Sequence, residues 1–248
     1  MRSGAVARLA AMGLLSVLGV GALCALGSGL AAQPAVKAVA TPPVPDVVVD
    51  DWRAGPLGQQ GIPPGWEGQT WGKTSAFALS VVVDESGQRV LHLESRNDRA
   101  TITRDLRGSV SLARTPILRW RWKVIALPAG GDARKLETAD QAAQVYVTWP
   151  RVPALLRSRI IGYAWDTSAP AGSTFRSQKT GTVTYIILRS GPAEAGRWLE
   201  ERRDVRADFL AIYGEEPPDP GAITLSIDSN DTHSHAESLI GPLRFSPS

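Results

Sequence analysis

The chain is almost without cysteine. Cys24 is the only cysteine among 248 residues, and it lies in an apolar N-terminal stretch. A domain that begins after this stretch has no disulfide, no thiolate metal ligand and no cysteine nucleophile. Its stability must therefore come from burial of a core, for which about two hundred residues are sufficient.

Net charge is also nearly absent beyond the N-terminus. The chain has 27 basic and 24 acidic residues, and two of the basic ones, Arg2 and Arg8, precede the apolar stretch, which leaves an excess of one positive charge. Because phosphate binding needs a basic surface, this balance predicts no nucleic-acid partner.

Motifs for catalysis and metal binding are missing as well. The sequence has no Gly-x-Ser-x-Gly elbow, so a hydrolase triad has no support and we assign no catalytic residue. A zinc site needs three or four ligands. His233 and His235 are close together, but His92, the third histidine, falls in a different predicted strand. We interpret the pair as part of a surface loop and predict no metal ligands there.

The N-terminus carries the clearest signal that is present. Arg2 and Arg8 are followed by apolar residues from 9 to about 30 and then by small residues, which is typical of a secretory signal. We predict a signal peptide over 1–32, a flexible Ala/Pro/Val linker over 33–46 and one domain over 47–248, located in the periplasm or secreted. Cleavage could follow residue 31 or residue 40.

Two alternatives for this segment stay open. Lipid attachment at Cys24 would need a small preceding residue, and Leu23 stands there. A retained membrane anchor would be barely long enough and is weakened by several glycines. We expect no membrane insertion after signal removal.

Short alternating segments fill the rest of the chain. In residues 117–124, Leu118, Trp120, Trp122 and Val124 share one face, while Arg119, Arg121 and Lys123 share the other. Residues 143–149 repeat the pattern. Further strands are predicted over 100–104, 160–165, 182–189, 223–228 and 243–245, and a hairpin joins 77–83 to 90–95 through a four-residue turn at 84–87.

Helical signals are few. Asp204 can cap a helix that ends before Gly214, and residues 153–159 suit a second short turn. With about nine or ten strands and one or two short helices, the pattern predicts an all-β fold, a β-sandwich or jelly roll.

Eight tryptophans make glycan binding a hypothesis, because sugar faces stack on aromatic rings. Trp120, Trp122 and Trp149 lie on the apolar sides of their strands, so we predict that they are core residues. The better ligand candidates are Trp66 and Trp71, in a Gly/Pro-rich region, and Trp165, at a strand end.

A polar shelf is the second candidate. If residues 117–124 and 143–149 form neighbouring strands, Arg119, Arg121, Gln144 and Tyr146 lie side by side and can bind hydroxyls or a carboxylate. The alternative is an ordinary solvated sheet face. The predicted binding residues are Arg119, Arg121, Gln144, Tyr146, Trp165 and Asp166.

Acidic residues offer two weaker candidates. Asp50 and Asp51 together with residues 228–231 are rich in oxygen atoms and could hold calcium, although such clusters are usually turns. Asp140 and Asp166 could serve as the acid and base of a glycosidase. Otherwise we expect no cofactor.

Several segments, taken in order, resemble the bacterial domain-of-unknown-function family 3047. They include Gly72-Lys73-Thr74-Ser75, Leu118 to Val124, Ala139 to Val147, Tyr163-Ala164-Trp165, Glu201 to Val205 and Ile227 to Thr232. The resemblance implies an exported protein and no established activity. Where the family tends to have paired acids and an arginine, this chain has Asp140-Gln141 and Gln144, so a role of those acids does not carry over. The layout is distantly similar to galactose-binding-like sandwiches and carbohydrate-binding modules.

Three functions follow as hypotheses. The first is a non-catalytic exported module that binds a glycan or another cell-envelope component. The second is a hydrolase of envelope polysaccharide, and the third is an envelope scaffold protein.

Overall fold

The computed structural model describes residues 43–68 and 79–248. The chain divides into two units, Met1–Thr41 and Pro42–Ser248, and the fold below is that of the second. The predicted signal peptide with Cys24, most of the predicted linker, and Trp71 lie outside the described residues. Within the described residues, no helix has the length and apolar character needed to cross a membrane.

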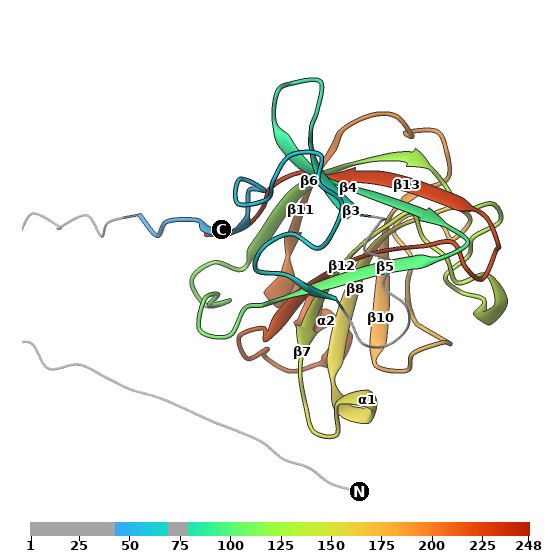
Figure 1. The fold of residues 1–248 in the computed structure, drawn as a ribbon. Coiled ribbons are helices and arrows are strands. Elements are labelled where there is room, and N and C mark those ends of the chain that lie inside the picture. Colours follow the sequence, from blue (N-terminus) through green and yellow to red (C-terminus); the bar gives the residue numbers. More distant parts are fainter. Residues whose placement is uncertain (1–42, 69–78) are drawn as a thin grey trace, which may run out of the picture. The chain divides into compact units, whose positions relative to one another are not determined.

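The described residues form two sheets in which most neighbouring strands run antiparallel (Figure 1). Sheet A has the strand order β1 (Val47–Asp50), β14 (Leu243–Ser246), β6 (Ile117–Ala126), β13 (His235–Ile240), β4 (Arg89–Arg96) and β3 (Leu79–Val83), with β11 (Leu199–Asp204) paired to β6. Sheet B has the order β2 (Glu67–Gly68), β5 (Arg99–Asp105), β12 (Ala222–Asp228), β7 (Ala143–Trp149), β8 (Arg159–Asp166), β10 (Val183–Ser190) and β9 (Thr174–Arg176). The prediction of an all-β sandwich is confirmed.

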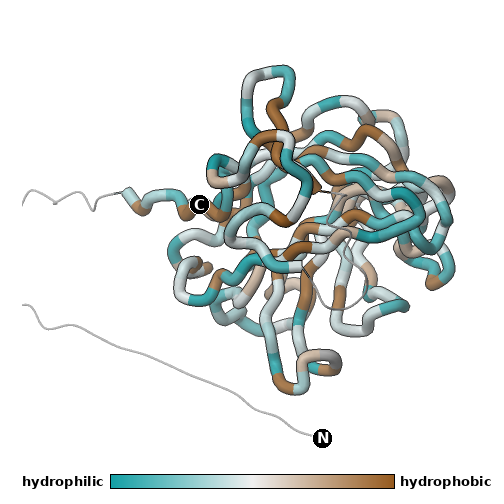
Figure 2. Tube along the Cα trace, viewed as in Figure 1, coloured by the Kyte–Doolittle hydropathy of each residue, from teal (hydrophilic) through white to brown (hydrophobic). Residues whose placement is uncertain are grey.

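Aromatic side chains fill the space between the sheets. The Trp120 ring of β6 lies 5.6 Å from the ring of Tyr163, and the Trp122 ring lies 6.2 Å from that of Trp165. All four side chains are buried, and each contributes about 3 kcal/mol to stability through burial. In Figure 2 apolar and polar residues alternate in short segments, as strands with one buried face require. The prediction that Trp120, Trp122 and Trp149 belong to the core is confirmed.

Local sequence signals positioned several elements correctly. The predicted hairpin is β3–β4, but five residues connect its strands, because Val83 pairs with Arg89 and the amide of Asp84 donates to the carbonyl of Gln88. Helix α2 (Val205–Tyr213) is capped by the Asp204 side chain and ends at Gly214, which has a positive φ of 71°. The second short helix is α1 (Ala154–Arg157).

The described residues contain fourteen strands, more than predicted. Strand β11 was not predicted, because its sequence is mostly charged and shows no alternation of apolar and polar residues. In the ladder, Glu200 lies opposite Arg121 and Arg202 lies opposite Arg119, both on β6. Strand β13 was also missed.

Asp50, at the end of β1 in sheet A, connects this strand to β5 of sheet B. Its Oδ2 accepts hydrogen bonds from the Trp66 indole at 2.7 Å and from the Arg104 guanidinium at 2.5 Å, and its Oδ1 accepts one from the Trp52 amide at 2.7 Å. The Trp52 and Trp66 rings stack with centroids 5.6 Å apart. Asp51 is partly exposed and pairs with Arg53.

We expect Asp50→Ala to lower the free energy of unfolding by roughly 2–4 kcal/mol, because it leaves the buried Trp66 indole N–H and the Arg104 charge without their acceptor. Asp51→Ala is the matched control and should change stability by less than about 0.5 kcal/mol. Urea unfolding of the two variants checks this, and equal losses for both would contradict the assigned role of Asp50.

Candidate functional site

The predicted polar shelf is split between the two sheets. Strand β6 carries Arg119 and Arg121 on the outer face of sheet A, whereas β7 carries Gln144 and Tyr146 on the outer face of sheet B. The expectation that these two strands are neighbours is wrong. Both strands alternate as predicted, but which strands pair depends on contacts distant in sequence.

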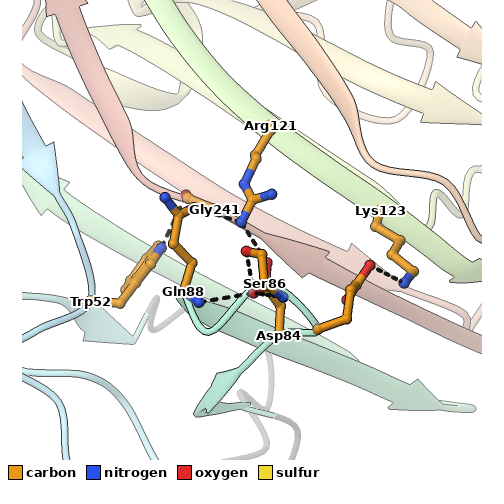
Figure 3. A network of polar contacts seen from close by, with 8 residues as sticks. Trp52, Asp84, Ser86, Gln88, Arg121, Lys123 and Gly241 are labelled. Carbon is orange, nitrogen blue, oxygen red and sulfur yellow. Dashed lines mark hydrogen bonds and ion pairs between the residues drawn. The ribbon is translucent and has the colours of Figure 1, made fainter.

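Two cations of β6, Arg121 and Lys123, contact the β3–β4 turn (Figure 3), whereas Arg119 donates to Ser246 Oγ at 2.8 Å. Arg121 donates to Asp84 Oδ2 at 2.5 Å and to Gln88 Oε1 at 2.6 Å, and its guanidinium lies 4.1 Å from the centre of the Trp198 ring. Lys123 pairs with Glu85 at 2.9 Å. Arg121 and Lys123 therefore already have acidic partners within the protein.

Trp165 and Asp166 are both buried at the end of β8. The Trp165 side chain points into the core, and its indole donates to the Gly191 carbonyl at 3.1 Å. The Asp166 carboxylate accepts hydrogen bonds from three backbone amides, those of Ala133, Ser168 and Ala169. Burial raises the pKa of Asp166 although these amides oppose the change. The structure thus gives Trp165 a packing role and Asp166 a role in organising two loops.

The other predicted candidates also have structural partners. Trp66 is buried against Trp52, so the expectation that its ring could stack on a ligand is wrong for the described fold. The two halves of the predicted calcium cluster lie apart, because Asp50 contacts Arg104 near one end of β5 while Asp228 pairs with Arg99 at the other end.

A cavity of about 180 Å³ lies on the outer face of sheet B. We call it the sheet B cavity. Strands β7, β10 and β12 contribute Tyr146, Thr148, Tyr185, Thr224, Ser226 and Asp228 to its lining. The loop between β9 and β10 contributes Ser177, Lys179 and Thr180. Hydroxyl groups dominate this surface, and the volume suits one ring-sized group.

A chain of hydrogen bonds runs across the floor of the sheet B cavity. The hydroxyls of Tyr185 and Tyr146 are 3.0 Å apart, and the Tyr146 hydroxyl also donates to the Gln144 side-chain oxygen. The Gln144 amide then donates to Asp228 Oδ1 at 2.8 Å, which accepts a second hydrogen bond from the Gln141 backbone amide at 2.7 Å. Residues on three strands of sheet B, β10, β7 and β12, are joined in this way.

Gly162 provides the space for the two tyrosine rings. This β8 residue lies opposite Tyr146 on one side and Tyr185 on the other. A Cβ at this position would come within 2.8 Å of the Tyr146 ring and 3.0 Å of the Tyr185 ring. The bare backbone lets the rings lie low over the sheet and form the wall of the cavity. Burial raises the pKa of both tyrosines well above the ordinary value, so both hydroxyls stay protonated.

Asp228 is the only carboxylate that lines the sheet B cavity among the described residues. Burial raises its pKa from 3.8 to about 7, with a smaller contribution in the same direction from Asp140. Its side chain can therefore donate or accept a hydrogen bond near neutral pH. At the rim, Lys179 pairs with Asp231.

Sequence reasoning found part of this site. Gln144 and Tyr146 were predicted, and they lie together. Tyr185 and Thr224 were missed, although their outward positions in alternating strands were a usable signal, and Asp228 was predicted only as part of the calcium cluster. The loop residue Lys179 carried no such signal.

A family model described as "Protein of unknown function (DUF3047)" matches residues 64–244. The match covers most of the chain, so the chain belongs to this family. No curated protein matches the chain in sequence.

Solved structures with similar folds include three carbohydrate-binding modules. The CBM22-1 xylan-binding domain of Paenibacillus barcinonensis Xyn10C shares 11% identity over 76% of this chain and 88% of that one, with a TM-score of 0.37. The family 11 module of Clostridium thermocellum shares 8% over 82% and 96%, with a TM-score of 0.40. The Caldicellulosiruptor saccharolyticus CBM27-1 shares 12% over 83% and 98%, with a TM-score of 0.36. At these scores the similarities support no argument about a ligand.

The raised pKa of Asp228 predicts a specific pH dependence of stability. The folded protein holds this proton more tightly than the unfolded chain does. The stabilisation that protonated Asp228 gives to the folded state is therefore complete below about pH 4, and it is lost as the pH rises through about 7. Asn mimics the protonated acid, so Asp228→Asn should remove this loss.

We expect the free energy of unfolding of Asp228→Asn to rise relative to that of the parent by about 3 kcal/mol between pH 5 and pH 8, at about 1.4 kcal/mol per pKa unit over the roughly two pH units below the raised pKa. Urea unfolding of both proteins across this range measures the difference. A constant difference in the free energy of unfolding would contradict the raised pKa. Asp231→Asn, at the rim, is the control.

Proposed function

We propose that this member of the DUF3047 family is an exported, non-catalytic module that binds a glycan in the sheet B cavity. The observation that carries the proposal is the joined floor of two tyrosines, one amide and one carboxyl group beneath a lining of hydroxyls. Export is supported by the basic and apolar N-terminal segment.

The chemistry of the sheet B cavity suits a polyhydroxylated ring. Sugar hydroxyls both donate and accept hydrogen bonds, and the lining offers groups that do the same in Thr148, Thr224 and Ser226. The Tyr146 and Tyr185 rings, 6.1 Å apart and tilted by 55°, add apolar surface for the C–H faces of a sugar. The hydroxyls of Thr224 and Ser226 already bond to those of Thr103 and Thr101, and a sugar hydroxyl would extend these pairs.

The size of the cavity limits what it can hold. About 180 Å³ is less than the roughly 300 Å³ at which pockets for drug-sized molecules begin. One sugar unit can enter, while the rest of a glycan would lie along the outer face of sheet B. This predicts modest affinity for a monosaccharide and higher affinity for an oligosaccharide.

The test is binding of the full chain to a panel of immobilised oligosaccharides, followed by calorimetric titration with each hit. We expect Tyr146→Phe and Tyr185→Phe to weaken binding by roughly 5- to 30-fold, because each variant removes one hydroxyl while keeping its ring. Tyr163→Phe is the matched control, since its hydroxyl donates to Asp208 and neither of these residues lines the cavity.

Two outcomes would contradict glycan binding in this cavity. One is the absence of binding to every member of the panel at millimolar concentration. The other is binding that both cavity variants leave unchanged. Calorimetry is preferred to tryptophan fluorescence because the sheet B cavity contains no tryptophan among the described residues.

Asp228 supports a second candidate, a glycan hydrolase. A carboxyl group with a pKa of about 7 suits a general acid near neutral pH. The two acids suggested by the sequence suit this role less well, since Asp140 accepts two hydrogen bonds from Thr232 and Asp166 is held by backbone amides.

For the hydrolase candidate we expect release of reducing sugar from polysaccharides that bind the protein, and a loss of at least about 100-fold in this rate with Asp228→Asn. Binding of the same polysaccharides by the variant should persist. No product from the parent protein, or equal rates for parent and variant, would exclude a catalytic role of Asp228.

A further inference from the structure

Pairing of β4 with β13 brings four potential metal ligands onto one outer face of sheet A. Glu94 and His92 alternate along β4, and Glu237 and His235 alternate along β13. Glu94 lies directly opposite Glu237 in the ladder. The sequence placed these residues in separate segments, and only the ladder makes them neighbours.

The distances within this group fit a small cation. One ligand atom each from Glu94, His235 and Glu237 lies within 4.8 Å of the others. His235 Nε2 is 3.3 Å from Glu94 Oε1 and 3.9 Å from Glu237 Oε2. Bonds of about 2.0–2.1 Å to a tetrahedral zinc ion separate its ligands by about 3.3 Å, so only small side-chain adjustments are required.

Two further observations point to a cation at this place. Two carboxylates directly opposite each other in a ladder repel, and a bound cation removes the repulsion. In addition, His235 Nε2 is buried and makes no hydrogen bond within the described residues, although it faces the Glu94 carboxylate. In the neutral imidazole this nitrogen can carry the lone pair that binds a metal.

His92 completes the arrangement from the other side of Glu237. Its Nε2 lies 2.9 Å from Glu237 Oε1, while Glu237 Oε2 faces His235. A hydrogen bond from His92 would fix the orientation of the Glu237 carboxylate. Arg96 forms an ion pair with Glu94 and is the main competing cation, but its side chain is 73% exposed and free to move away.

We propose that Glu94, His235 and Glu237 form a site for a divalent transition metal, with His92 as a positioning residue. The mixed imidazole and carboxylate set favours Zn²⁺ over Ca²⁺ or Mg²⁺, which prefer oxygen ligands only. The bound ion would tie β13 to β4. This site is separate from the sheet B cavity and does not depend on glycan binding.

The test is a competition titration of the metal-free full chain, without a polyhistidine tag, against a chromophoric zinc chelator. We expect one equivalent of Zn²⁺ to bind and a rise in the thermal midpoint when Zn²⁺ is added, because the ion binds the folded state. Mg²⁺ and Ca²⁺ should produce neither effect.

Variants at the three histidines assign the site. His235→Asn should abolish the zinc-induced rise in the thermal midpoint, and His92→Asn should weaken zinc binding by about 10- to 100-fold. His233→Asn is the matched control, because His233 lies in the preceding turn and contacts Asn97 instead. Circular dichroism establishes that each variant is folded.

The proposal is overturned if the folded parent binds less than one equivalent of Zn²⁺ at micromolar concentration. It is equally overturned if folded His235→Asn retains parental affinity, or if His233→Asn loses as much affinity as His235→Asn.

Discussion

Burial of the large aromatic side chains between the two sheets is the constraint on which the rest of the structure depends. Trp120 and Trp122 on β6 meet Tyr163 and Trp165 on β8. Because side chains alternate along a strand, a shift of one residue in either strand would expose these rings and bury their polar neighbours. The inward position of these rings therefore also fixes which residues face outward on both sheets.

Alternation explains how much of the fold was predictable. The sequence of β6 indicated the correct inner and outer faces, and α2 was bounded correctly by Asp204 and Gly214. Trp165 could have been placed in the core by the same rule, since it shares the parity of Ile161 and Tyr163. Strand β11 lacked the signal because its charged residues are stabilised by cross-strand partners on β6.

Pairing between strands was the part that sequence could not supply. Alternation indicates which face of a strand is exposed to solvent. Which strand lies next to it depends on contacts across the whole domain. For this reason the β6 and β7 residues were joined into one shelf, while they belong to opposite sides of the sandwich. The same limitation separated His92 from His235, which the β4–β13 ladder brings onto adjacent strands. Gln144 and Tyr146 were identified, but their connection to Tyr185 and Asp228 was not.

The neighbouring strands β8 and β10 run parallel, so the chain between them must cross back along the sheet before it can pair. This crossover contains β9 and the turn that carries Ser177, Lys179 and Thr180. This turn supplies one side of the sheet B cavity, and strands of sheet B supply the other. Surface segments of this kind tolerate substitution far better than packed strands do. The lining of the sheet B cavity can accordingly change through substitutions in the crossover alone, while the aromatic layer beneath remains intact.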